Sequence, residues 1–176
     1  INLDEKIFIA GSSGMVGSSI CRIMRNSGYG NEKLGGKILT PSRKELNLLD
    51  SESVGNWFKK NKPTIVIFAA AKVGGIYANL TYPADFILEN LKIQTNVIES
   101  AWKNSVKRFL FLGSSCIYPK HAYQPIKEEE LLRGYLEPTN ESYAIAKISG
   151  IKLCQALRKQ YDFDSISLMP TNLYGT

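Results

Sequence analysis

The sequence predicts an α/β fold, a doubly wound parallel sheet with helices on both faces. Three observations support this prediction. Segments with the features of strands alternate with segments with the features of helices along the chain. The strand segments are continuous apolar runs, as expected when both faces of a parallel sheet are covered. The first strand segment leads through a glycine-rich turn at 11–17 into a helix, which is typical of nucleotide-binding α/β folds.

Each predicted element has a local reason in the sequence. The predicted strands are short runs rich in β-branched, aromatic or leucine side chains, and they cover 6–10, 37–40, 64–69, 108–112 and 165–169. The predicted helices cover about 15–27, 51–60, 83–104 and 142–161. Asp50 is placed to cap the second helix, and Pro83 suits the first turn of the third. Residues 113–141 form a longer irregular stretch after a strand, where loops usually hold ligands.

Composition excludes several classes of protein. The 176 residues, 44% hydrophobic and 22% charged, suit one globular domain spanning 1–176. The net charge is +6, but the basic residues are scattered, so we expect anionic small-molecule ligands and no nucleic-acid partner. No apolar run approaches the ~20 residues of a membrane span, and the N-terminal residues lack a signal-peptide pattern. We therefore expect a cytoplasmic protein with no membrane partner.

The cysteines and the histidine predict neither disulfides nor a metal site. Cys21, Cys116 and Cys154 are an odd and sparse set, which fits a reducing compartment. The only histidine, His121, lies in the irregular stretch, and no Cys/His cluster has the spacing of metal ligands. We therefore expect no metal.

The glycine-rich turn predicts a dinucleotide site. It consists of Gly11, Ser12, Ser13, Gly14, Met15, Val16 and Gly17. Glycines permit a tight turn and close approach of a pyrophosphate, and the helix that follows offers free N–H groups to phosphates. The spacing is Gly-x-x-Gly-x-x-Gly, and a plain structural turn is the alternative interpretation.

The residue after the second strand predicts which dinucleotide binds. An NAD site usually has an acidic residue here for the ribose 2′-hydroxyl, whereas this chain has Arg43, with Lys44 beside it. A guanidinium suits a 2′-phosphate, so the pattern favours NADP(H) over NAD. The alternative is a solvated basic turn.

A tyrosine and a lysine four residues apart predict an acid/base pair. Tyr143 and Lys147 fall on one face of the last predicted helix. A phenol titrates near ~10, and a neighbouring ammonium lowers that pKa toward the range of general acid/base catalysis. The spacing alone is more often a packing tyrosine beside a solvated lysine, so the prediction depends on the rest of the chain.

Ser114 and Cys116 follow the fourth predicted strand, where a sheet presents side chains to a ligand. The Ser114 hydroxyl can hydrogen-bond a substrate carbonyl or the Tyr143 phenol. The Cys116 thiol can act as an acid or a base if its pKa is suitable, and would otherwise be inert.

Taken together, these residues resemble the extended short-chain dehydrogenase/reductase family, and within it the enzymes that epimerise and reduce GDP-4-keto-6-deoxy-mannose. The resemblance runs from Lys6 to the end of the chain. The most specific segments are Ala-Lys-Val-Gly-Gly at 71–75 and Ser-Ser-Cys-Ile-Tyr-Pro at 114–119, with further matches at 14–18, 45–50, 82–87, 137–147 and 169–175.

The resemblance implies a Rossmann fold, NADP(H) as cofactor, a GDP-sugar substrate and a homodimer. It implies that Cys116 is the base that inverts C3 and C5, that Tyr143 protonates the C4 oxygen as hydride arrives, and that Ser114 holds that oxygen. It implies that Lys147 lowers the pKa of Tyr143 and binds the nicotinamide ribose. Further cofactor contacts are implied at Leu48, Leu112, Gly113, Ser114, Ser115, Pro170, Thr171, Asn172 and Leu173.

Two departures from the family pattern affect these expectations. Ser13 stands where the family often has a basic residue, so one contact to the 2′-phosphate is lost. The family's partner acid, a histidine, and its nucleotide-sugar domain lie beyond Thr176, so we expect this chain to be the N-terminal portion of a longer enzyme and to be inactive alone. Two other functions stay open: another NAD(P)-dependent nucleotide-sugar epimerase or dehydratase, and a non-catalytic NADP sensor.

Overall fold

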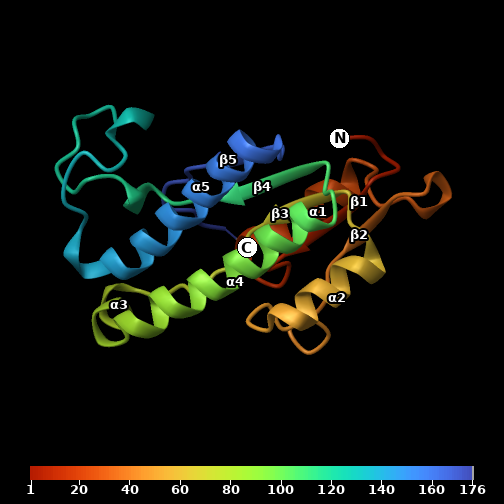
Figure 1. Cartoon of the computed structure of the whole chain (residues 1–176), viewed down its shortest axis with the longest axis horizontal. Helices are drawn as coiled ribbons and strands as arrows, with labels where there is room; N and C mark the ends of the chain where they lie inside the picture. The colour runs from red at the N-terminus through yellow and green to blue at the C-terminus, as the bar shows by residue number, and fades with distance from the viewer. Residues whose placement is uncertain (176) are drawn as a thin grey trace.

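A single parallel sheet organises the computed structural model, which describes residues 1–175. The strands lie in the order β2-β1-β3-β4-β5 (Figure 1). They are β1 (Lys6–Ala10), β2 (Lys37–Leu39), β3 (Ile65–Phe68), β4 (Arg108–Leu112) and β5 (Ser165–Leu168). The α-helices are α1 (Met15–Asn26), α2 (Ser51–Asn61), α3 (Ile76–Thr81), α4 (Pro83–Lys103) and α5 (Glu141–Tyr161). Short 3₁₀ turns are η1 (Glu32–Leu34), η2 (Ser115–Ile117), η3 (Glu128–Glu130) and η4 (Pro138–Asn140).

The predicted strands and helices are confirmed, with ends that differ by no more than one residue. Asp50 caps α2 as predicted, because its Oδ1 accepts hydrogen bonds from the N–H groups of Glu52 and Ser53 at 3.0 and 3.2 Å. Pro83 opens α4. Helix α3 was not predicted; it has six residues, and its N-cap, Gly75, makes no side-chain capping bond. Such a short helix carries too little periodicity to be recognised.

Alternate residues of the central strands point to opposite faces of the sheet, and each face has its own core. Phe8, Val66, Phe109 and Phe111 belong to the larger core, against α2, α4 and α5. The other face is smaller and is covered by α1: there the isoleucines of β1 and β3 pack against Cys21. Helices therefore lie on both faces, as predicted for a doubly wound sheet.

The strand order places a crevice beside β1. β1 pairs with β2 on one side, Phe8 opposite Leu39, and with β3 on the other, Phe8 opposite Val66. The chain leaves β1 toward β2 and then returns past β1 to β3, so the loops after β1 and β3 separate at the carboxyl ends of the strands. Open α/β sheets bind their ligands at such a switch point.

Candidate active site

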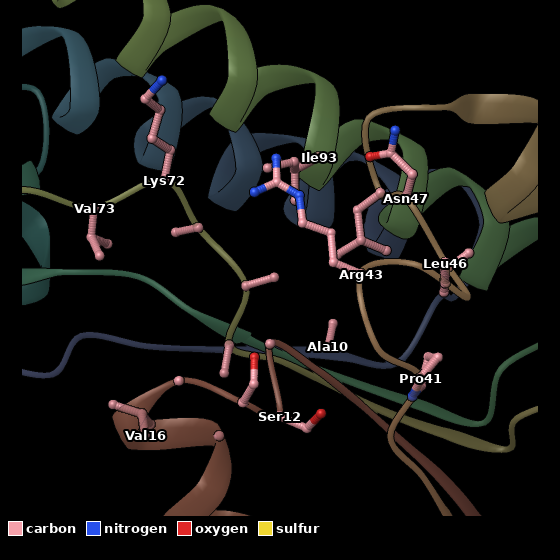
Figure 2. Close-up of a pocket in the computed structure, with 18 of the residues that line it drawn as sticks. Ala10, Ser12, Val16, Pro41, Arg43, Leu46, Asn47, Lys72, Val73 and Ile93 are labelled. Atoms are coloured by element: carbon pink, nitrogen blue, oxygen red, sulfur yellow. The ribbon is translucent and has the colours of Figure 1, made fainter.

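A pocket of about 720 Å³ lies at the carboxyl ends of β1, β2 and β3 (Figure 2). All seven residues of the glycine-rich turn, 11–17, line it, as do Arg43 and Leu48. The pocket therefore gathers the predicted cofactor residues of the first half of the chain. Its volume lies within the range typical of small-molecule sites.

The glycine-rich turn has the backbone geometry that its sequence predicts. Gly11 has a φ of +82°, which side chains rarely tolerate, and a Cβ there would lie 2.8 Å from the backbone of Ala70. A Cβ on Gly17 would overlap the carbonyl of Gly11. Gly14 caps α1 without using a side chain. The N-terminus of α1 thus opens directly onto the pocket, where its N–H groups and positive potential suit a phosphate.

Arg43 is exposed and reaches into the pocket from the loop after β2. Figure 2 shows its side chain extending toward Ile93, across the pocket from Ser12. Within residues 1–175 the guanidinium forms no ion pair, so its charge is available to an anion. Lys44 does not line the pocket.

Several residues that line the pocket were not predicted from the sequence. The segment 69–73, which follows β3, forms one wall, and Glu89 and Ile93 of α4 extend it. The signal was present, because the carboxyl end of a parallel strand next to the glycine-rich turn is where ligand contacts are expected. Pro41, Leu46, Asn47 and Leu49 complete the side near Arg43.

The predicted Tyr143–Lys147 pair meets on α5. The Lys147 Nζ lies 5.8 Å from the centre of the Tyr143 ring and 5.1 Å from that of Phe111. Lys147 is only 3% exposed, and its ammonium donates a hydrogen bond to the Leu112 carbonyl oxygen at 2.8 Å. Two residues at the predicted spacing therefore do share one face, and the lysine is anchored to the end of β4.

The predicted effect of Lys147 on the pKa of Tyr143 is wrong in this structure. Burial of the phenol, and next the nearby Cys116, raise the pKa of Tyr143 to about 12. Burial lowers the pKa of Lys147 to about 8, so this lysine keeps most of its charge at pH 7 and loses it as the pH rises through 8. The physical reason is that desolvation penalises the charged form of both groups, and the lysine's hydrogen bond goes to a backbone carbonyl.

Ser114 and Cys116 lie at the start of η2, directly after β4. The Ser114 Oγ accepts a hydrogen bond from the Cys116 backbone N–H at 3.5 Å, which fixes the turn. Burial raises the pKa of the Cys116 thiol, opposed by the Ser114 hydrogen bond and the charge of Lys147. The thiol is therefore protonated at neutral pH. No hydrogen bond joins Ser114 to Tyr143 within the described chain.

Backbone hydrogen bonds bring the last predicted cofactor segment beside this cluster. The N–H of Gly113 donates to the Leu168 carbonyl at 2.7 Å, and the N–H of Ser115 donates to the Pro170 carbonyl at 3.1 Å. Thr171, Asn172 and Leu173 continue from there and are exposed. The ends of β4 and β5 are thus joined along one edge.

The predicted site residues consequently form two neighbouring groups at one edge of the sheet. The ends of β1, β2 and β3 build the pocket. The ends of β4 and β5, with α5, build a second group that holds Ser114, Cys116, Tyr143 and Lys147, and none of these four lines the pocket. His121 lies in an exposed part of the loop before α5.

The described residues hold neither a metal cluster nor a membrane-spanning helix. Among residues 1–175, no three histidine, cysteine or acidic side chains gather closely enough to hold a metal ion. All three cysteines are free thiols. No helix of the described chain combines the length and the apolarity that crossing a bilayer requires.

A doubly wound sheet with a glycine-rich turn opening into a pocket at its carboxyl edge defines the class of Rossmann-fold domains. Residues 7–176 match the model of one family within that class, described as the NAD dependent epimerase/dehydratase family. The chain belongs to this family.

The chain is similar in sequence to several GDP-L-fucose synthases. The chain is 59% identical over 170 residues to a putative GDP-L-fucose synthase 2 of Arabidopsis thaliana, covering 97% of this chain and 50% of that protein. It is 55% identical over 171 residues to the GDP-L-fucose synthase of Escherichia coli strain K12, covering 97% and 51%. The chain therefore spans about half the length of these relatives.

Solved structures agree with the fold. A GDP-L-fucose synthetase from Naegleria fowleri bound to NADP superimposes with a TM-score of 0.84 at 29% identity, covering 99% of this chain and 52% of that one. A GDP-6-OMe-4-keto-L-xylo-heptose reductase from C. jejuni gives a TM-score of 0.93 at 38% identity, covering 100% and 49%.

Proposed function

We propose that this chain is the cofactor-binding half of an NADPH-dependent epimerase-reductase that converts GDP-4-keto-6-deoxy-D-mannose to GDP-L-fucose. The observation that carries the proposal is the grouping of Ser114, Cys116, Tyr143 and Lys147 at the ends of β4 and α5, beside the glycine-lined pocket. Identities of 55–59% to GDP-L-fucose synthases over 97% of the chain support the same substrate. The whole protein would supply the remaining contacts to GDP.

The pocket fits NADP(H). The glycine-rich turn leaves its backbone open, since Gly11 and Gly17 have no room for a Cβ, and α1 begins there. Arg43 offers an unpaired guanidinium at the β2 side of the pocket, where a 2′-phosphate would bind. Leu48 and Leu49 supply an apolar wall on the same side. Gly113, Ser115 and the segment 170–173 lie along the edge that would face the nicotinamide.

Reduction requires a proton donor at C4. When bound, the reduced nicotinamide supplies the hydride. Tyr143 retains its phenolic proton through the neutral range because burial raises its pKa to about 12, and in this proposal it gives that proton to the C4 oxygen. Lys147, whose pKa is about 8, then returns a proton toward the phenolate. The Ser114 hydroxyl orients the C4 oxygen by donating a hydrogen bond to it.

Epimerisation requires a base at C3 and C5. The 4-keto group makes those C–H bonds acidic, and the Cys116 sulfur accepts the proton in this proposal. The thiol must first lose its own proton, which its burial opposes and the charge of Lys147 favours. The acid that returns a proton to the other face would come from the second half of the whole protein.

Assembly and location complete the proposal. α4 and α5 pack side by side (Figure 1) and expose Leu88 and Ile145, at 52% and 39%. We expect these helices to pair with their copies in a homodimer, to be tested by sedimentation of the wild type and of L88E.

Three free thiols suit the reducing cytoplasm.

The decisive experiment incubates the full-length protein with GDP-4-keto-6-deoxy-mannose and NADPH and follows the absorbance of the reduced nicotinamide. In deuterated water, label is expected at C3 and C5 of the product. Absence of NADPH oxidation with this substrate refutes the proposed reductase activity. Reduction without deuterium at C3 and C5 leaves a reductase and removes the epimerase.

A second candidate is the reduction of a GDP-heptose, because reductases of that class from C. jejuni superimpose with TM-scores of 0.92 and 0.93. Their identities of 37–38% fall below the 55–59% of four GDP-L-fucose synthases but above the 29% of the GDP-L-fucose synthetase from Naegleria fowleri. Comparing kcat/KM for GDP-4-keto-6-deoxy-mannose and for a GDP-4-keto-heptose decides between the two.

A further inference from the structure

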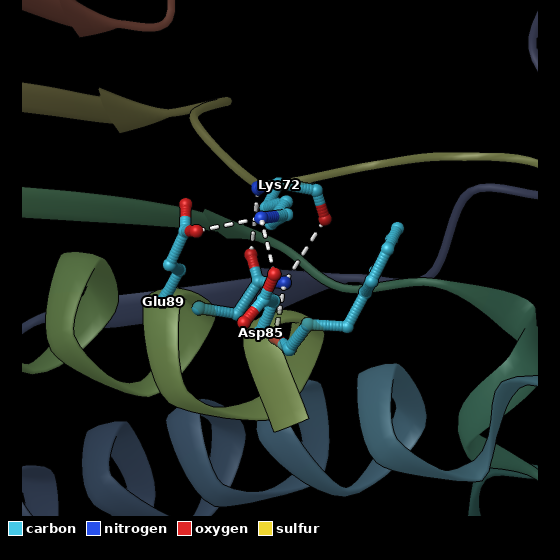
Figure 3. Close-up of polar contacts among 5 residues, drawn as sticks. Lys72, Asp85 and Glu89 are labelled. Carbon is cyan, nitrogen blue, oxygen red and sulfur yellow. Dashed lines mark hydrogen bonds and ion pairs between the residues drawn. The ribbon is translucent and has the colours of Figure 1, made fainter. Parts of the chain in front are cut away.

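The wall of the pocket after β3 is tied to helix α4 by two adjacent residues of that helix. The Asn90 side chain, 3% exposed, accepts a hydrogen bond from the Lys72 N–H at 2.8 Å and donates to the Lys72 carbonyl at 2.9 Å. Glu89 forms an ion pair with the side chain of Lys72, whose Nζ donates a hydrogen bond to the Glu89 Oε1 at 2.6 Å. Lys72 is therefore attached to α4 at two points, its backbone at Asn90 and its side chain at Glu89 (Figure 3).

The first turn of α4 also packs closely against Lys72 and Gly74. The carboxylate of Asp85 lies 3.7 Å from the Lys72 Nζ, and the Phe86 ring centre lies 5.8 Å from it. A Cβ on Gly74 would lie 2.8 Å from the Phe86 ring, so the loop after Lys72 can lie on α4 only because it has no side chain there. Figure 2 shows Lys72 pointing away from Ser12 and from the centre of the pocket.

The same wall abuts the glycine-rich turn. Ala70 lies so close to Gly11 that a Cβ on Gly11 would meet its backbone at 2.8 Å. Residues 69–73 therefore sit between the turn that receives the pyrophosphate and the helix that carries Glu89. Any shift of Lys72 away from α4 moves the wall relative to the turn.

We propose that Glu89 is a positioning residue for dinucleotide binding, which acts by holding Lys72 and, through it, the pocket wall 69–73 at a set distance from the glycine-rich turn. The inference rests on the proposed binding of NADP(H). The Lys72–Glu89 pair has side chains 29% and 31% exposed, so it is less screened by water than a surface pair. Asp85, the second carboxylate near the Lys72 ammonium, is 58% exposed and therefore holds Lys72 less firmly than Glu89 does.

The test measures the Kd of NADPH by nicotinamide fluorescence for the full-length wild type, E89Q, K72M and K72R. E89Q and K72M are expected to raise the Kd about tenfold, the scale of one coupled ion pair. K72R keeps the cation and is expected to stay within about threefold of the wild type. The Kd of 2′-AMP, which reaches only the Arg43 side, is expected to stay unchanged in all four proteins.

A matched control is available on the same helix. Glu99 and Lys103 form a pair with the same 2.6 Å separation, remote from the pocket. E99Q is expected to leave the Kd of NADPH unchanged. The proposal is overturned if E89Q and K72M bind NADPH like the wild type, if their binding of 2′-AMP weakens equally, or if E99Q has the same effect. A wild type that does not bind NADPH refutes the proposed function instead.

Discussion

The ammonium of Lys147 donates a hydrogen bond to the carbonyl oxygen of Leu112 across 2.8 Å, joining helix α5 to the end of strand β4. The two residues are 35 positions apart in the sequence. This bond places the lysine under the Phe68 and Phe111 rings, 5.9 and 5.1 Å from their centres, and removes it from water. Burial therefore raises the free energy of the charged form of Lys147, the form that was expected to act on Tyr143.

This burial predicts a pH dependence of stability. The pKa of Lys147 is about 8 in the folded chain against the ordinary 10.5, so between these values the unfolded chain binds more protons. The free energy of unfolding of the wild type, relative to K147M, is expected to rise with pH across this window by roughly 3 kcal/mol. Urea titrations at intervals from pH 7 to 10.5 measure the difference. A difference that stays constant over this range contradicts the prediction.

Replacing Tyr143 by phenylalanine is expected to remove the proton donor while keeping the ring. Loss of a general acid lowers the rate of reduction by roughly 10²- to 10⁴-fold, and the Kd of NADPH should change little. Stopped-flow oxidation of NADPH in the full-length protein measures the rate of reduction, and fluorescence titration measures the Kd of NADPH. Turnover at the wild-type rate would remove Tyr143 from the mechanism.

Replacing Cys116 by serine is expected to impair epimerisation more than reduction. A serine hydroxyl is a far weaker acid than a thiol, so it is less readily converted to the ionised base. The measurement is deuterium entering C3 and C5 from the solvent, read by NMR. Incorporation at the wild-type rate would show that another group is the base.

Replacing Arg43 by alanine is expected to weaken NADPH binding about 10- to 100-fold, the scale of a hydrogen bond to a charged group. Binding of NADH, which lacks the 2′-phosphate, should be spared. K44A is the control, because Lys44 is next in sequence but does not line the pocket. Equal losses for NADPH and NADH in R43A would refute a contact to the 2′-phosphate.

Two glycine substitutions separate a required glycine from a tolerant one. A Cβ on Gly17 would overlap the Gly11 carbonyl, so G17A is expected to lower the free energy of unfolding by about 2 kcal/mol or more and to abolish NADPH binding. A Cβ on Gly55, within α2, would meet no atom within 4 Å. G55A is expected to raise stability by about 0.5–1 kcal/mol. Thermal or urea unfolding compares them, and equal effects would contradict the packing argument.

Local sequence was sufficient for the strands, for four of the five α-helices and for the backbone geometry of the glycine-rich turn. Residues 7–10 and 65–68 are short apolar runs rich in isoleucine, valine and phenylalanine, which is typical of a strand covered on both faces. The spacing of the glycines in the turn at 11–17 indicates a backbone that side chains would obstruct. The position of the wall 69–73 at the end of β3 was a usable signal, but its attachment to α4 was not, because the partners of Lys72 on α4 lie 13 to 18 positions later in the sequence. The short helix α3 has no local signal of comparable strength.

The sequence by itself determined the alternation of strands and helices, the geometry of the turn at 11–17, and the placing of Tyr143 and Lys147 on one helix face. These follow from the backbone preferences of neighbouring residues, which act over a few positions. Only the tertiary structure decided the protonation of that pair, because the pKa of a group depends on what buries it. It also decided that Glu89 and Asn90 reach Lys72, since that contact joins two segments that meet only when the sheet has folded.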